Sequence, residues 1–167
     1  YAGVSVSVTH DNEIELIVLT GTGDIDGSGD SQANEIRGNP GRNSLFGGAG
    51  DDSLIGGKGA DLLTGGGDND TFAGIMAEFA GDTVTDFDRG DRIHLTNADY
   101  ATFTFTQVND TLVFGGVNLT IADSAGQRFY KQAAADGGVE IRLGNQRAPD
   151  DYSGDGRSDA LWLHSSG

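Results

Sequence analysis

An apolar residue recurs at every ninth position through the middle of the chain, and this spacing limits the folds open to it. The recurring residues are Ile36, Leu45, Leu54, Leu63 and Phe72. The blocks around the last three read GGAGDDSLI, GGKGADLLT and GGGDNDTFA. Such a unit is too short for a pair of helices, and its paired glycines oppose helix formation. The spacing therefore predicts a β-solenoid, whose repeats stack on their neighbours.

The charge of the chain favours cations as ligands. Lys and Arg total 10 residues against 26 Asp and Glu, so the formal net charge is −16. This charge repels nucleic acid and anionic lipid, and we expect neither as a partner. No apolar run reaches the length of a membrane-spanning helix, so no membrane insertion is expected. The absence of cysteine excludes disulfides and thiolate metal sites.

The blocks resemble the nonapeptide GGxGxDxUx, with U a large apolar residue, of the repeats-in-toxin (RTX) family. The match is strong over 47–73 and degraded over 29–46. Similar segments occur in serralysin-type proteases, alginate epimerase R-modules and adhesins. The resemblance implies an all-β fold, a parallel β-roll loaded with calcium and closed by a carboxy-terminal antiparallel β cap. In such a roll each repeat forms a turn and a short strand, and two repeats complete one coil.

Repeats eighteen residues apart would then stack on the same edge, which gives position six of each block a role. Stacked strands lie about 4.8 Å apart, so Asp52 and Asp70 would bring two carboxylates together. Like charges at this distance repel unless a cation lies between them, and Ca²⁺ accepts six to eight hard oxygen ligands. We expect roughly two to four ions in this segment. The pairs Asn43–Asp61 and Asn34–Asp52 are weaker candidates because an amide replaces one carboxylate.

The resemblance assigns calcium ligands to positions two, four and six of each block. The resulting set is Asn34, Asn39, Gly41, Asn43, Gly48, Gly50, Asp52, Gly57, Gly59, Asp61, Gly66, Asp68 and Asp70. The alternative is that these aspartates are solvated turn residues, because Asp and Gly are common in turns. Turn chemistry does not require a fixed period, which favours the metal-binding interpretation.

The patterns divide the chain into four segments. Residues 1–28 are expected to form amino-terminal strands or irregular coils, either as a hairpin or as two short coils. The roll is expected over 29–80 and a β-strand cap over 81–143, because an open solenoid end exposes unpaired backbone. Residues 144–167 are expected to form a linker and a partial calcium-binding loop.

The terminal loop is a second calcium candidate. Its oxygen ligands follow the spacing of an EF-hand loop without the closing glutamate, and comprise Asp151, Ser153, Asp155, the carbonyl of Arg157, and Asp159. The segment resembles a single FG-GAP or VCBS repeat. One such blade cannot bury its own faces, so we expect the parent protein to continue beyond Gly167. A plain surface turn is the alternative.

The expected function is that of a calcium-binding RTX module. By resemblance, it folds on calcium binding outside the cell and supports the secretion, through a type I channel, and the stability of a larger secreted or surface protein. Its expected partners are calcium ions and the neighbouring domains of that chain, and we expect a monomer.

Two other functions stay open. One is a calcium-dependent carbohydrate-binding or adhesive module with a polysaccharide partner, and the other is a small hydrolase or lyase. We expect no enzyme, because His10, His94 and His164 are isolated and no catalytic motif occurs. The tripeptide Arg89-Gly90-Asp91 matches an integrin ligand, but DFDRGDRIHL resembles the turn that closes many RTX rolls, so integrin binding is not expected.

Overall fold

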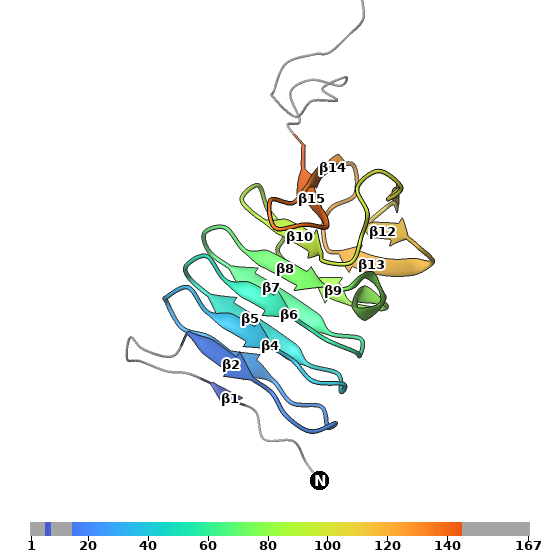
Figure 1. Cartoon of the computed structure of the whole chain (residues 1–167). Coiled ribbons are helices and arrows are strands. Elements are labelled where there is room, and N and C mark those ends of the chain that lie inside the picture. The colour runs from blue at the N-terminus through green and yellow to red at the C-terminus, as the bar shows by residue number, and fades with distance from the viewer. Residues whose placement is uncertain (1–5, 8–14, 145–167) are drawn as a thin grey trace, which may run out of the picture.

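The computed structural model describes residues 6–7 and 15–144, whose strands form two sheets that face each other along a column of stacked coils (Figure 1). The first sheet contains, in order, β1 (Val6–Ser7), β3 (Gly27–Ser28), β5 (Ser44–Gly48), β7 (Leu62–Gly66), β9 (Thr83–Val84), β13 (Val117–Ile121), β12 (Thr111–Phe114) and β11 (Thr106–Val108). The second contains β14 (Phe129–Ala133), β15 (Val139–Leu143), β10 (Arg92–Leu95), β8 (Thr71–Gly74), β6 (Ser53–Ile55), β4 (Glu35–Arg37) and β2 (Leu16–Val18). The predicted all-β fold of parallel coils is confirmed.

The nine-residue period is the period of the core. Within the repeats the chain alternates between the two sheets, and strands eighteen residues apart pair in parallel, as Leu45 does with Leu63 and Leu54 with Phe72. The recurring apolar residues are completely buried between the sheets: Ile36, Leu45, Leu54, Leu63 and Phe72. Burial of each such side chain stabilises the fold by about 1.5–3 kcal/mol. One core residue per short strand is a small core for each coil.

The parallel stacking extends on both sides of the repeats. At the amino end, β1 pairs in parallel with β3, and β2 pairs in parallel with β4. Because β1 and β2 lie in opposite sheets, they belong to a coil of the solenoid and do not form a hairpin. Beyond the repeats, β9 pairs with β7 and β10 pairs with β8. The step there is twenty-one residues, because a short 3-10 helix, η1 (Met76–Phe79), lengthens the intervening turn. Phe79 of η1 is buried and adds to the core.

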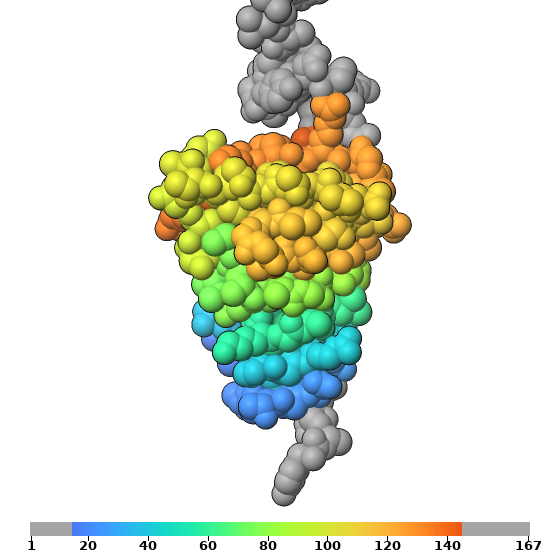
Figure 2. Space-filling model, turned by 90° about the vertical axis from the view of Figure 1, so that its right-hand side faces the viewer, coloured from blue at the N-terminus to red at the C-terminus, as the bar shows by residue number. Residues whose placement is uncertain are grey.

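An antiparallel cap closes the carboxyl end of the roll, as predicted. Strands β13, β12 and β11 extend the first sheet, and β15 and β14 extend the second. The cap end of the molecule is broader than the amino-terminal end (Figure 2). The cap thereby covers backbone groups that an open solenoid end would leave unpaired.

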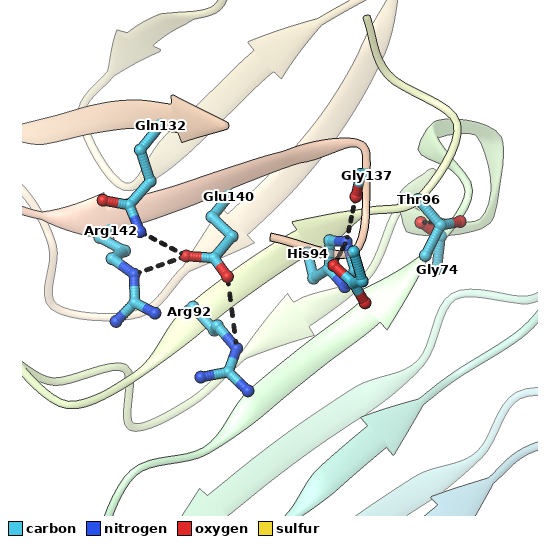
Figure 3. Close-up of polar contacts among 9 residues, drawn as sticks. Gly74, Arg92, His94, Thr96, Gln132, Gly137, Glu140 and Arg142 are labelled. Atoms are coloured by element: carbon cyan, nitrogen blue, oxygen red, sulfur yellow. Dashed lines mark hydrogen bonds and ion pairs between the residues drawn. The ribbon is translucent and has the colours of Figure 1, made fainter. Parts of the chain in front are cut away.

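Polar contacts on the second sheet join the cap to the roll (Figure 3). Glu140 of β15 accepts hydrogen bonds from Arg142 (2.8 Å) and Gln132 (2.6 Å), and it lies 3.8 Å from Arg92 of β10. His94 of β10 contacts the Gly137 carbonyl through Nε2 at 2.9 Å. The described residues include no helix that is long and apolar enough to cross a membrane.

Candidate metal centre

The position-six residues of the repeats, continued by Asp82 and Asp91 beyond them, stack into one column along each edge of the roll. We call Asn34, Asp52, Asp70 and Asp91 the first column, and Asn43, Asp61 and Asp82 the second. All are buried, with exposed fractions of 4% or less. Within each column the Oδ1 atom of an aspartate accepts the main-chain N–H of the residue one coil earlier.

This stacking brings together the pairs that the sequence spacing predicts. Oδ1 of Asp70 accepts the N–H of Asp52 at 2.9 Å, and Oδ1 of Asp61 accepts that of Asn43, also at 2.9 Å. The Asn34–Asp52 contact has the same form at 2.7 Å. Each gap between consecutive members of a column is therefore lined by two position-six side chains.

The columns also contain two aspartates that the sequence interpretation missed. Asp82 accepts the N–H of Asp61 at 2.8 Å, and Asp91 accepts that of Asp70 at 2.8 Å. The longer turn around η1 moves both residues to a spacing of twenty-one, out of the nine-residue period. The structure thus adds two gaps in which both side chains are carboxylates.

Burial of these carboxylates disfavours their charged form. Burial, together with the smaller effect of the charges of Asp91, Asp52 and Asp86, raises the pKa of Asp70 to about 7. Burial likewise raises the pKa of Asp82 to about 7 and that of Asp52 to about 6. The pKa values of Asp61 and Asp91 are raised for the same first reason. A cation in these gaps would reverse the effect, because it stabilises the charged form.

Within residues 6–7 and 15–144, two carboxylate oxygens in the columns lack a hydrogen-bond partner. Oδ2 of Asp52 and Oδ2 of Asp61 are buried and, among the described residues, have no hydrogen-bond partner. Buried polar atoms in folded proteins almost always have a partner, and a carboxylate oxygen has a particular need for one. Because Asp52 and Asp61 lie in different columns, one cation at each edge of the roll would satisfy these oxygens.

Main-chain carbonyls converge on the same spaces. A Cβ atom built on Gly47 would collide with Oδ2 of Asp52 and would lie 2.5 Å from the carbonyl oxygen of Gly65 in the next coil. The glycine at position one therefore keeps open a space that oxygen atoms of two coils face. The carbonyls of Gly47 and Gly56 face the equivalent spaces beside Asn34 and Asn43. These position-one carbonyls were not among the predicted ligands.

The predicted ligands at positions two and four lie in the same turns. Gly48, Gly50, Gly57, Gly59 and Gly66 all have a positive φ, between 88° and 146°, which orients their peptide groups as few other residues could. Asp68 takes a φ of 74° without being glycine, and its Oδ2 accepts the N–H of Gly50 at 3.0 Å. Gly41 lies in the turn of the second column that also contains Asn39. Their role as ligands stays a prediction.

The donor set fits a hard cation. Within the described residues no three His, Asp or Glu side chains converge on one point, so the carboxylates occur as stacked pairs. Main-chain carbonyls would have to complete the coordination, and calcium accepts both kinds of oxygen.

Asp91 of the Arg89-Gly90-Asp91 tripeptide belongs to the first column and is buried, although Arg89 is exposed. Asp91 is 3% exposed, and its carboxylate accepts the N–H groups of Asp70 and Asp88 at 2.8 and 2.9 Å. Nearby, Asp86 accepts the N–H groups of Gly65 and Gly66, at 3.0 and 2.8 Å. The acidic group of the tripeptide therefore faces the roll, where a partner protein cannot reach it.

A comparison with protein families identifies the repeats. The model of the RTX calcium-binding nonapeptide repeat, in four copies, matches residues 28–63 and again residues 46–74. Residues 28–74 are RTX calcium-binding repeats. Together with the stacked parallel coils, this match makes the segment an RTX β-roll, a structural calcium-binding module. No curated protein matches the chain.

The match does not reach every part of the candidate site. Asp82 and Asp91 continue the columns outside the matched residues. The terminal loop, with Asp151, Ser153, Asp155, Arg157 and Asp159, lies outside the residues that the structure describes, and its FG-GAP-like role stays a prediction.

Proposed function

We propose that the RTX roll folds outside the cell when calcium enters the gaps of the two columns, and that it thereby supports the secretion and stability of a larger extracellular protein. The observation that carries this proposal is the pair of buried oxygens, on Asp52 and Asp61, that have no partner within residues 6–7 and 15–144. A fold that buries carboxylates in this way is poorly stable until a cation neutralises them. Calcium would supply that neutralisation.

Three gaps provide a carboxylate from both sides. These gaps lie between Asp52 and Asp70, between Asp70 and Asp91, and between Asp61 and Asp82. A ligand that binds only the folded state at one hundred times its Kd stabilises that state by about 2.7 kcal/mol per site. Three such sites would contribute about 8 kcal/mol, which is comparable to the whole stability of a typical domain. Calcium binding energy would therefore act as folding energy.

The calcium concentration at which the roll is expected to fold indicates that it folds outside the cell. Extracellular calcium modules work at about 10⁻⁴–10⁻³ M, far above the concentrations to which cytosolic sensors respond. The chain would stay unfolded in a cell, pass a type I secretion channel in that state, and fold on release. This function is structural: the roll would hold the neighbouring domains of its parent protein in place, with no catalytic role of its own.

A calcium titration of the chain tests the proposal. Far-UV circular dichroism should show little β-structure in chelator and a cooperative gain of β-structure at about 10⁻⁴–10⁻³ M calcium. Magnesium should substitute poorly, because it requires near-octahedral, water-rich coordination. A roll that is fully folded in excess chelator would overturn the proposal.

A further inference from the structure

The asparagine turns satisfy their inward-facing oxygen, in contrast to the aspartate turns of Asp52 and Asp61. Oδ1 of Asn43 and Oδ2 of Asp61 each face the position-one glycine of their own turn, so the two atoms occupy equivalent places. Oδ1 of Asn43 accepts the N–H of Asn39 at 2.8 Å, whereas Oδ2 of Asp61 has no partner among the described residues. The amide oxygen is thus satisfied within its own turn, and the carboxylate oxygen is not.

The same contrast holds in the first column. Oδ1 of Asn34 faces Gly29 and accepts the N–H of Asp30 at 2.8 Å. Its equivalent one coil later, Oδ2 of Asp52, is unpartnered among the described residues. At Asp52 and Asp61 the oxygen that is satisfied in the asparagine turn one coil earlier is therefore unsatisfied among the described residues. Asp91, at the cap end, again accepts an N–H from its own turn, that of Asp88, at 2.9 Å.

The side-chain amide nitrogens of Asn39 and Asn43 donate hydrogen bonds to carbonyl and amide oxygens. Nδ2 of Asn43 donates to the carbonyl of Ile25 in the preceding coil at 2.7 Å and to Oδ1 of Asn39 at 3.1 Å. Nδ2 of Asn39 donates to the Gly23 carbonyl at 2.9 Å. Oδ1 of Asn39 also accepts the N–H of Gly41 at 2.8 Å. N–H groups in this turn thus bind carbonyl and amide oxygens of the kind that calcium binds.

We propose that the turns 29–34 and 38–43 are closed by their own amides and hold no calcium, so that calcium enters only the three gaps with two carboxylates. This inference rests on the proposed function and replaces the expectation that Asn34, Asn39, Gly41 and Asn43 are ligands. A neutral amide oxygen that already accepts a hydrogen bond adds no charge to attract a cation. The amino-terminal coils are then held by amide hydrogen bonds, and calcium acts at the cap end of the roll.

The test is the number of calcium ions bound by the full chain, measured by equilibrium dialysis at saturating calcium. Asn43→Asp and Asn34→Asp each create a second carboxylate in a gap, and each variant should bind one more ion than the unmodified chain. The matched variant Asn43→Ala should bind the same number of ions, although amides of residues 20–43 should exchange hydrogen faster. Because only differences in ion number are compared, ions bound elsewhere in the chain cancel.

Each outcome decides the inference. Loss of an ion in Asn43→Ala would show that Asn43 is a ligand and would overturn it. Aspartate variants that fold but gain no ion would also overturn it, since the asparagines would then not be what excludes calcium. If the aspartate variants fail to fold, Asn43→Ala alone decides. An unmodified chain that binds no calcium would instead overturn the proposed function, and this inference with it.

Discussion

Asp70 lies in two of the three carboxylate gaps, so its replacement by asparagine should have opposite effects with and without calcium. Oδ1 of Asp70 accepts the N–H of Asp52 at 2.9 Å, and an asparagine oxygen can keep this hydrogen bond. The substitution therefore removes charge with little change of shape. In saturating calcium, each weakened site represents about 2.7 kcal/mol at one hundred times its Kd, so the loss should reach about 5 kcal/mol.

Without calcium the sign reverses. The shift of the Asp70 pKa from 3.8 to about 7 corresponds to a destabilisation on the order of 4 kcal/mol at neutral pH, since each unit is 1.36 kcal/mol. Removal of the charge relieves this penalty. Asp70→Asn should therefore retain at least as much β-structure in chelator as the unmodified chain, yet need a calcium concentration more than about tenfold higher to complete folding.

The assay is far-UV circular dichroism during calcium titration, with guanidinium unfolding at saturating calcium to measure the free energy. Asp51→Asn is the matched control, because Asp51 occupies position five and contacts the exposed Asn69 at 2.9 Å. The control should leave the calcium midpoint unchanged. Equal shifts for both variants would show that the charge in the column has no special role, and the reasoning would fail.

Three further predictions concern the turn glycines, the buried carboxyls and the terminal loop. Gly47→Ala should weaken calcium binding and lower stability by about 2 kcal/mol or more, because its Cβ would displace the Asp52 carboxylate, whereas Gly67→Ala, with nothing within 4 Å, should be neutral or slightly stabilising in the same thermal scan. In calcium-free buffer, β-structure should increase as the pH falls from about 8 to 4, because the folded state takes up protons at the raised pKa values of about 6 to 7 while the unfolded carboxyls have 3.8; a flat circular dichroism signal over this range would contradict the pKa shifts. Asp155→Ala should remove one ion from a calorimetric titration and leave the folding transition of the roll in place, and a shift of that transition would show that the terminal loop is not independent.

The sequence predicted the core and part of each column for a simple reason. A constant period places residues such as Leu45 and Leu63 in equivalent positions, and the same period stacks Asp52 on Asp70. Asp82 and Asp91 escaped prediction because the turn with η1 is longer and shifts them off the period, while parallel pairing of β9 and β10 keeps them in the columns. Only the three-dimensional pairing shows that the columns continue.

Two other features of the site have no direct signal in the sequence. The carbonyl of Gly65 faces the space beside Asp52, but a main-chain oxygen is present at every position and no residue letter marks it. In the sequence, Asn43 and Asp61 occupy the same position of their blocks and look like a weaker and a stronger version of one calcium ligand. The Asn39 N–H donates to Oδ1 of Asn43, whereas Oδ2 of Asp61 has no partner in the part of the chain that the structure describes, so the two turns differ in kind.

The most direct test of calcium in the columns is a crystal structure of the chain grown in calcium, with anomalous difference data that locate the ions. We expect peaks between Asp52 and Asp70, between Asp70 and Asp91, and between Asp61 and Asp82, each within about 2.3–2.6 Å of carboxylate and carbonyl oxygens. We expect no peak beside Asn43. A folded roll with no anomalous peak in any of the three gaps would contradict the claim that calcium orders this fold.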